Sequence, residues 1–351
     1  MNFEQKTMGT LKNGETVDQL TLTNDHGVSI RVLTFGATWQ GFDVPNGHGG
    51  QANLLVGYDQ LSDYEATPFY VCKTVGRVAG RIGGATYDID GTTYRSDQNE
   101  NKNTLHGGYH GFSDRVWDVV DHQTNEDEIS VTLSLIVDED VDHFPGDMQV
   151  KVTYTLTNED KVTWSITGNS TATTLFNPTL HTYFNVTDQD ALSTQQLWIN
   201  GHQRVRLGSD KVPTGALAEV ADTPYDFTET ATITDQLAKL ATENGGREFD
   251  DAYRVNGDQK QAIATVSDPA SGRALDVFSN RNGLVIFTAD PLGYDQDEAY
   301  QASHPFTALA MEAQWLPDAI HHDGFGDIVL PAQADQTYQI SYQYRKLGST
   351  N

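Results

Sequence analysis

Three side chains in this 351-residue sequence are of types that transfer protons and stand among apolar, aromatic or glycine neighbours. Glu312 follows the apolar run Ala308–Met311, His181 lies in the segment Leu180–Phe184, and His106 precedes two glycines. A histidine and a glutamate held apart in a largely apolar cleft can move two protons on one small molecule. The sequence therefore indicates an acid–base site, provided that the fold brings these segments together.

The surroundings of Glu312 and His181 support a chemical role to different degrees. Glu312 is expected in an inward-facing strand, where an unpaired charge is costly, so its carboxylate must be paired or functional. Burial would also raise its pKa towards the range of a useful base. A lone histidine among apolar residues is more often a hydrogen-bonded core residue than a catalyst, so the local sequence leaves His181 open.

Two further charged segments could bind a polar ligand or could be structural. The glycine-rich stretch Gly76–Gly84 carries Arg77 and Arg81 but lacks the pattern of a nucleotide-phosphate loop. One of these arginines could reach a ligand, and a salt-bridged arginine on a tight turn explains the stretch equally well. Asp250 and Asp251 stand close to aromatic residues, which suits sugar hydroxyls, although a pair of turn aspartates is the simpler interpretation.

Histidine spacing gives no support for a metal site. His106 and His110 are four residues apart, as in a helical metal pair, but glycines at positions 107, 108 and 111 argue against a helix there. His321 and His322 are adjacent, which suits surface residues better than ligands. We expect no metal and no other cofactor.

Charge and composition disfavour several classes of partner. The formal net charge is −27, from 49 acidic and 22 basic residues, so nucleic acid and anionic membranes would be repelled. The single cysteine, Cys72, permits no intramolecular disulfide, and neither a secretory signal nor an apolar run of membrane-spanning length is visible. We expect a cytoplasmic protein.

Hydrophobic periodicity predicts an all-β fold. Apolar residues alternate with polar ones over 28–32, 129–137, 150–156, 162–166 and 338–344, which is the pattern of strands with one buried face. The best helical candidate is short, from Thr232 to Leu240. No linker or change of composition divides the chain, so residues 1–351 are expected to form one domain, an antiparallel sandwich or barrel.

Several motifs, taken in order, resemble those of the aldose 1-epimerase (galactose mutarotase) family over nearly the whole chain. Their joint order and spacing are highly specific. The motifs are Leu33–Ala37, Gly76–Ile82, Asn103–Gly108 (N-x-L-H-G-G), His181–Asn185 (H-x-Y-F-N), Pro213–Gly215, Thr223–Phe227, Glu312, Gln314–Trp315, Pro317–Asp318 and Leu330–Pro331.

The resemblance implies a large antiparallel β-sandwich of the galactose mutarotase type, with few short helices. It also implies an enzyme that interconverts the α and β anomers of free aldohexoses such as galactose and glucose. Glu312 matches the general base, His181 the general acid and His106 an assisting histidine. Arg81 and Asp250 match substrate-binding positions. No cofactor is implied, and the assembly is a monomer or a homodimer.

Four departures from the family pattern concern the sugar more than the reaction. Gly80 and Leu180 stand where many members have asparagine, and Asp251 stands where histidine is common. Arg281 lies near a position often filled by a sugar-contacting glutamine. We therefore expect Arg281 at the rim of the sugar site, where it would influence the choice of sugar.

The implied mechanism needs one base and one acid. Ionised Glu312 takes the proton from the C1 hydroxyl, protonated His181 gives a proton to the ring oxygen, and the ring opens to the aldehyde. Rotation about C1–C2, followed by closure with the proton roles reversed, gives the other anomer.

Three other functions compete with this one. A sugar-binding module on the same fold would bind without turnover. An epimerase for a phosphorylated hexose could use Arg77, Arg81 and Arg281 to hold the phosphate. A glycoside hydrolase could use Glu312 and Asp250 as its two carboxylates.

Overall fold

Antiparallel strands dominate the computed structural model, which describes residues 1–46, 49–297, 299–300 and 304–348. The all-β prediction is confirmed. The α-helices among these residues are α1 (Leu61–Ala66), α2 (Glu139–Asp142) and α3 (Ile233–Asn244). The predicted helix over Thr232–Leu240 is therefore present and runs four residues further, and its buried Ile233 and Leu240 attach it to the core.

Four of the five strands predicted from alternation lie in one nine-stranded sheet. Along β14 every second side chain is buried, as a strand with one face on a core requires. In sheet order the strands are β11 (Asp118–Thr124), β12 (Glu128–Val137), β13 (Met148–Thr157), β14 (Lys161–Ser170), β28 (Gln336–Lys346), β24 (Arg273–Ser279), β23 (Ala264–Asp268), β18 (Gln196–Ile199) and β21 (Ala231–Thr232).

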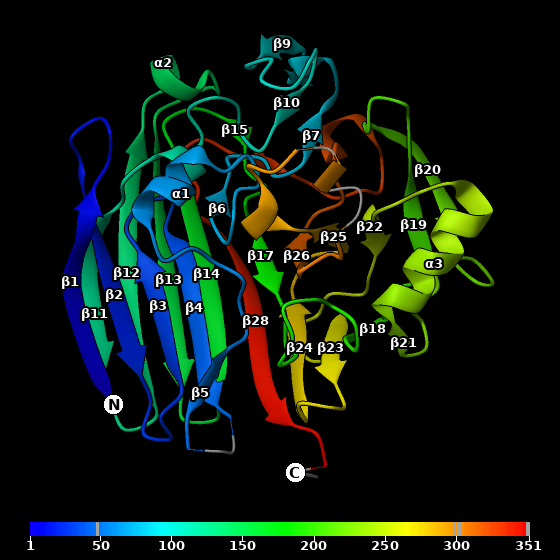
Figure 1. Ribbon diagram of the computed structural model, residues 1–351. Coiled ribbons are helices and arrows are strands. Elements are labelled where there is room, and N and C mark those ends of the chain that lie inside the picture. Colours follow the sequence, from blue (N-terminus) through cyan, green and yellow to red (C-terminus); the bar gives the residue numbers. More distant parts are fainter. Residues whose placement is uncertain (47–48, 298, 301–303, 349–351) are drawn as a thin grey trace.

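A five-stranded sheet covers one half of the nine-stranded sheet. Figure 1 shows its blue strands in front of the green β11–β14. Trp39, which is fully buried, joins the two layers, because its ring lies 6.5 Å from that of Tyr154 on β13 and 4.9 Å from that of Tyr342 on β28. The strands, in order, are β1 (Asn2–Thr10), β2 (Thr16–Thr23), β3 (Ser29–Leu33), β4 (Thr38–Pro45) and β5 (Gln51–Asn53).

A third sheet, of six strands, carries Glu312. Its strand β26 is buried along its whole length, whereas β14 of the nine-stranded sheet is buried only at every second position. Buried apolar residues of all three large sheets contribute to one connected core cluster, while Val205 and Ala252 of the six-stranded sheet belong to a second, smaller cluster. The strands, in order, are β17 (Thr182–Phe184), β26 (Ala308–Gln314), β25 (Gly283–Ala289), β22 (Asp250–Arg254), β19 (Gln203–Leu207) and β20 (Pro213–Glu219).

Short two-stranded pairs bring distant loops to the six-stranded sheet. The pairing of β7 with β10 sets Leu105 opposite Arg81, so His106 follows directly beside that arginine. The pairing of β6 with β16 sets Leu180 opposite Thr74 and leads the chain into His181. These strands are β6 (Thr74–Val75), β7 (Arg81–Ile82), β8 (Thr86–Ile89), β9 (Thr92–Arg95), β10 (Thr104–Leu105), β15 (Thr174–Leu175), β16 (Thr179–Leu180) and β27 (Val329–Leu330).

The helices of the described residues are all too short or too polar to span a membrane.

Candidate active site

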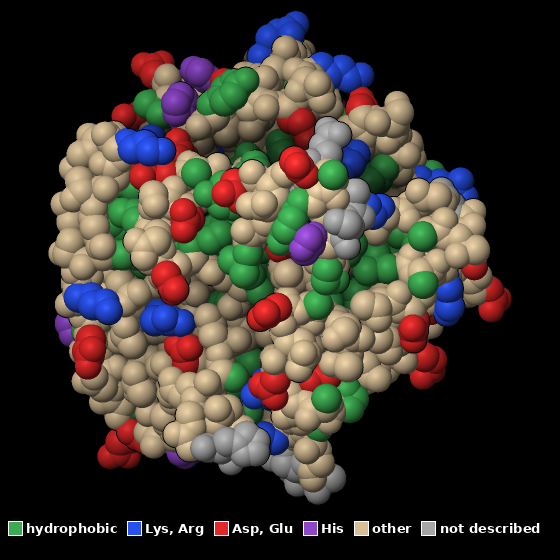
Figure 2. Space-filling model, in the orientation of Figure 1, with side chains coloured by type: hydrophobic (Ala, Val, Ile, Leu, Met, Phe, Trp, Pro, Cys, Tyr) green, Lys and Arg blue, Asp and Glu red, His purple; other side chains and the backbone are tan. Residues whose placement is uncertain are grey.

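A cavity of about 420 Å³ lies against one face of the six-stranded sheet. Figure 2 shows hydrophobic side chains gathered in the middle of the molecular face that carries β17 and β25 in Figure 1, with acidic side chains spread around them. The sheet supplies the floor of the cavity, and the segments around Tyr70, Arg81 and His106 supply its walls. The floor residues are Tyr183, Leu207, Asp250, Ala252, Val285, Phe287, Glu312 and Gln314.

The structure brings five of the six predicted site residues to this cavity. Glu312, His181, His106, Arg81 and Asp250 all line it. Glu312 and the two histidines are buried, and each offers a polar atom within 4.8 Å of those of the other two. Their segments are more than seventy positions apart in the sequence, so only the fold makes them neighbours.

His181 and Glu312 face each other directly, with 3.4 Å between Nε2 and Oε1. Two threonine hydroxyls attach the His181 segment to β26 on either side of Glu312. Thr182 Oγ1 donates to the Met311 carbonyl and Thr179 Oγ1 donates to the Ala313 carbonyl, both at 2.8 Å. The ring of His181 also stacks on that of Tyr183, with 5.1 Å between centroids. This combination of backbone ties and ring stacking fixes the distance between the two groups.

Several buried polar atoms of the cavity have no hydrogen-bond partner among the residues that the structure describes. They are His181 Nδ1, Glu312 Oε2 and both side-chain atoms Oε1 and Nε2 of Gln314. Unpaired buried polar groups are rare because each costs about 1–3 kcal/mol. Four such atoms in one cavity indicate a polar ligand with several hydroxyl groups.

Burial shifts the pKa values of the facing pair in opposite directions. It lowers the pKa of His181 to about 4 and raises the pKa of Glu312 to about 8. The negative charge of Asp250 raises the pKa of Glu312 further, and Arg81 partly offsets it. Between about pH 4 and pH 8 the pair therefore holds one proton, and burial places that proton on Glu312.

His106 is held as a neutral hydrogen-bond donor. The Gly80 N–H donates to His106 Nδ1 at 3.2 Å, so this nitrogen is unprotonated and Nε2 carries the hydrogen. Burial lowers the pKa of His106 well below its usual value, and nearby His181 and Arg81 lower it further. Gly80 adopts a φ of +70°, a left-handed conformation that favours glycine or asparagine, which accounts for the departure at this position.

The cluster His106, His181 and Glu312 has the reach of a metal site, and histidine spacing in the sequence did not reveal it. Metal ligation through His106 Nε2 would require the ring proton to move to Nδ1, where it would meet the Gly80 N–H. The cluster therefore fits hydrogen bonding to a ligand better than metal ligation.

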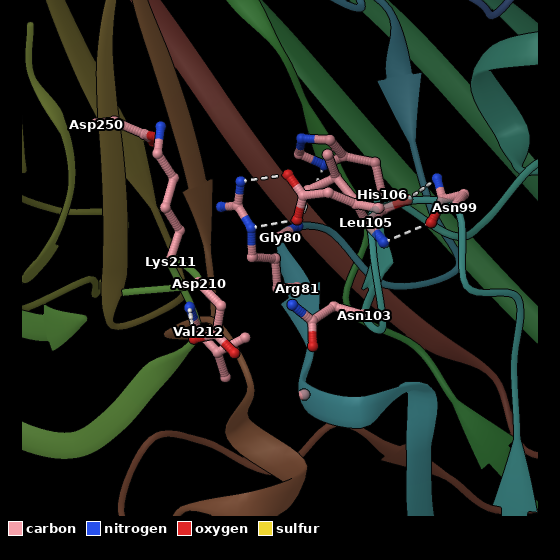
Figure 3. A network of polar contacts seen from close by, with 12 residues as sticks. Gly80, Arg81, Asn99, Asn103, Leu105, His106, Asp210, Lys211, Val212 and Asp250 are labelled. Atoms are coloured by element: carbon pink, nitrogen blue, oxygen red, sulfur yellow. Dashed lines mark hydrogen bonds and ion pairs between the residues drawn. The ribbon is translucent and has the colours of Figure 1, made fainter. Parts of the chain in front are cut away.

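The two predicted substrate-binding residues are both held by oppositely charged neighbours. Arg81 forms a two-pronged ion pair with Glu100, with Nε–Oε2 at 2.6 Å and Nη2–Oε1 at 2.7 Å. Asp250 Oδ2 accepts from Lys211 Nζ at 2.6 Å, and Figure 3 shows Asp250 and Lys211 beside Arg81. The side chain of Asp251 points away from the cavity, because successive side chains alternate between the two faces of β22. It forms an ion pair with Arg204 at 3.0 Å.

The expected rim position of Arg281 is wrong. Its side chain is fully buried and does not line the cavity. Its guanidinium group donates to the carbonyls of Pro178 and Ala313, the latter at 2.6 Å, and lies over the ring of Tyr338 at 4.6 Å. Arg281 precedes β25 and is buried in the core, whereas Val285 of β25 lines the cavity.

Arg77, Arg81 and Arg281, which were considered as phosphate ligands, do not form a common binding site. Arg77 is fully buried and forms two hydrogen bonds with Asp142, at 2.6 and 2.9 Å. Of Arg77, Arg81 and Arg281, only Arg81 lines the cavity, and its guanidinium group already forms an ion pair with Glu100. This arrangement disfavours a phosphorylated substrate.

Sequence reasoning missed other residues that line the cavity, among them Gln314, Glu100, Lys211 and Tyr70. Gln314 could have been found, because it lies two positions after Glu312 in a strand and so shares its face. Tyr70 contacts the rings of both His106 and His181, with centroids 4.8 and 6.2 Å apart. Glu100, Lys211 and Tyr70 lie in loops, where no periodicity predicts the direction of a side chain.

A buried acid–base pair in a cavity with unpaired polar atoms is typical of an enzyme that moves protons on a neutral, hydroxyl-rich molecule. Comparison with known proteins agrees with this class. The sequence model of the family described as "Aldose 1-epimerase" matches residues 18–345. The chain therefore belongs to the aldose 1-epimerase family and is an isomerase, which confirms the resemblance and excludes the glycoside hydrolase alternative.

Individual relatives cover the whole chain. A maltose epimerase of Levilactobacillus brevis is 43% identical over 347 residues, which are 99% of this chain and 100% of that protein. An aldose 1-epimerase of Streptococcus thermophilus is 38% identical over 98% of this chain and 99% of its own length. The structure of a galactose 1-epimerase from Lactobacillus acidophilus has a TM-score of 0.84 over 99% of both chains, and its 24% identity makes it evidence for the fold.

Proposed function

We propose that the protein interconverts the α and β anomers of a free aldose by acid–base ring opening and closure, with Glu312 and His181 as the reacting pair. The observation that carries this proposal is their direct approach of 3.4 Å in a cavity where Oε2 of one and Nδ1 of the other are unpaired. Aldohexoses such as galactose and glucose are the first candidates for the substrate.

The reaction moves protons at two atoms of the sugar, the C1 hydroxyl and the ring oxygen. Glu312 takes the proton of the C1 hydroxyl while His181 donates a proton to the ring oxygen. After ring opening, Glu312 is protonated and His181 is neutral. Closure on the other face of the aldehyde reverses both transfers, so the pair holds one proton throughout the cycle.

The pKa values of the pair match one stage of this cycle. Burial places the shared proton on Glu312, which is the arrangement that follows ring opening. The cyclic sugar needs that proton on His181. A C1 hydroxyl beside Glu312 and a ring oxygen beside His181 favour this transfer, because hydrogen bonds to a charged form stabilise it.

Other side chains of the cavity would hold the sugar hydroxyls. His106 offers its Nε2 hydrogen, and the unpaired amide of Gln314 offers both a donor and an acceptor. Arg81 and Asp250 are held in place by Glu100 and Lys211, so they present groups of defined direction. Fixed hydroxyl contacts keep C1 and the ring oxygen aligned with the two reacting groups.

Maltose is a second candidate substrate. It has one free reducing end, so the chemistry at its C1 is the same as in glucose. The 43% identity with a maltose epimerase over 99% of this chain favours it specifically.

Polarimetry tests the proposal. Freshly dissolved α-galactose, α-glucose, β-maltose and a hexose 6-phosphate are followed with and without the protein. We expect the free sugars to reach their normal final rotation faster with the protein, and the phosphate ester to show little acceleration. Binding of a free sugar in calorimetry without any acceleration would instead support the sugar-binding module.

A further inference from the structure

We propose that Phe69 and Phe287 form a platform for a second sugar ring, so that the cavity accepts the reducing end of a disaccharide. This inference rests on the proposed function, because it assumes that a reducing sugar reacts at Glu312 and His181.

The two phenylalanines form a half-buried aromatic surface inside the cavity. Both line it, and their ring centroids lie 6.1 Å apart with 37° between the ring planes. A sugar ring presents a face of C–H groups that packs on such a surface, while its hydroxyls point outward to polar groups. Neither phenyl ring can take part in proton transfer, so the reaction at C1 does not account for this surface.

Sheet register places the platform about one sugar ring away from the acid–base pair. Glu312 lies opposite Val285, and Phe287 follows two residues later on the same face of β25. Such diagonal neighbours are separated by roughly 7–8 Å. Phe287 in turn lies opposite Asp250 on β22, and Val285 lies opposite Ala252. A reducing ring that reacts at Glu312 would therefore lie over Val285 and Ala252, and a ring joined to it would lie over Phe287.

The linkage of a 1,4-joined disaccharide fits this direction. C4 lies across a pyranose ring from C1, so a second ring attached at O4 extends away from the reacting carbon. With C1 at Glu312 and His181, the second ring is directed to the end of the cavity that Phe287 and Asp250 occupy.

Polar groups for the second ring lie at the same end. Lys211 and Glu248 both line the cavity, with Lys211 Nζ 2.6 Å from Asp250 Oδ2 and 3.8 Å from Glu248 Oε1. An ammonium group has three hydrogens, so Lys211 can hold Asp250 and still donate to a hydroxyl. The end of the cavity beyond Asp250 thus combines an apolar face with charged hydrogen-bonding groups.

The first test compares substrates in variants of Phe287. Phe287→Ala should lower kcat/KM for maltose at least about tenfold relative to kcat/KM for glucose. Phe287→Leu should give a ratio between those of Phe287→Ala and the wild type. Phe278→Ala is the matched control, because Phe278 is also half-buried but lies on β24 of the nine-stranded sheet and does not line the cavity. Thermal midpoints of all variants separate loss of folding from loss of binding.

A second test uses the wild-type protein alone. Methyl α-maltoside and methyl α-glucoside cannot open at C1, so each acts as an inhibitor of glucose mutarotation. The platform predicts an inhibition constant at least about tenfold lower for the maltoside. This result does not depend on whether a variant folds.

The outcomes separate the two proposals. The platform is refuted if the wild type converts glucose but Phe287→Ala lowers kcat/KM for maltose and for glucose by the same factor. It is also refuted if methyl α-maltoside inhibits no better than methyl α-glucoside. In both cases the mutarotase function stands. If the wild type accelerates the mutarotation of none of galactose, glucose and maltose, the proposed function fails and the platform fails with it.

Discussion

Replacing Glu312 with glutamine should remove the base and keep the shape of the site. The amide has the size of the carboxyl group and can still hydrogen-bond the C1 hydroxyl, but it cannot accept its proton. We therefore expect kcat to fall roughly 10²–10⁴-fold, the usual contribution of one general base. Sugar affinity should change little, because the hydrogen-bonding reach is preserved.

The same change should stabilise the fold at neutral pH. Burial raises the pKa of Glu312 from 4.5 to about 8, so in this pH range the folded chain retains a proton that the unfolded chain releases. At this carboxyl group the folded state binds more protons, so the contribution of Glu312 to the free energy of unfolding is fully present below pH 4.5 and is lost as pH rises to about 8. Glutamine does not titrate and avoids this loss.

The size of the effect follows from the pKa difference. At pH 7 the interval above the unfolded-state pKa is about 2.5 units, which corresponds to ~3 kcal/mol. Unfolding entropy of about 2.1 cal/mol/K per residue gives roughly 0.7 kcal/mol/K for a chain of this length, so the thermal midpoint should rise by about 4 °C. At pH 5 the interval is only about 0.5 units, and the rise should be under about 1 °C.

Polarimetry and thermal unfolding on one preparation at pH 5 and pH 8 check both parts. Glu126→Gln is the control, because Glu126 is exposed and should change neither quantity. A folded Glu312→Gln variant that keeps more than about a tenth of the wild-type kcat would remove Glu312 from the role of base. A stabilisation of equal size at both pH values would refute the argument from the buried carboxyl group.

Three further predictions concern the pH dependence, the metal requirement and the sugar preference of the reaction. The pH profile of kcat/KM should be bell-shaped. Activity should fall below about pH 4, where both members of the His181–Glu312 pair are protonated, and above about pH 8, where both are deprotonated. A flat profile from about pH 3 to pH 10 would count against the pair. Activity should survive dialysis against EDTA, since the Gly80 N–H keeps His106 in a tautomer unsuited to ligation; loss of activity that zinc or manganese restores would overturn this. Arg281→Gln should leave the ratio of kcat/KM between glucose and galactose within about twofold, because Arg281 is buried outside the cavity; a changed ratio would show that it acts on the sugar.

The sequence alone predicted five of the strands and five of the residues that line the cavity. Alternation along 129–137 or 338–344 needs no long-range information, because the side chains of a strand point to opposite faces at every second position. Glu312 also stood out in the sequence, because a charged residue within the apolar run of β26 must be paired or functional. The motif order then identified Glu312, His181, His106, Arg81 and Asp250, all of which line one cavity. That residues 1–351 form one domain stays a prediction.

The tertiary structure decided which partner each charged residue meets. Arg77 and Arg81 come from one glycine-rich stretch, yet Arg77 pairs with Asp142 in the core and Arg81 pairs with Glu100 in the cavity. Arg281 was misplaced because its partners are backbone carbonyls at positions 178 and 313, which no side-chain pattern encodes. The pKa values of Glu312 and His181 also depend on burial by segments far away in the chain. Local spacing sets the direction of a side chain within its own strand, and only the packing of distant segments sets what it faces.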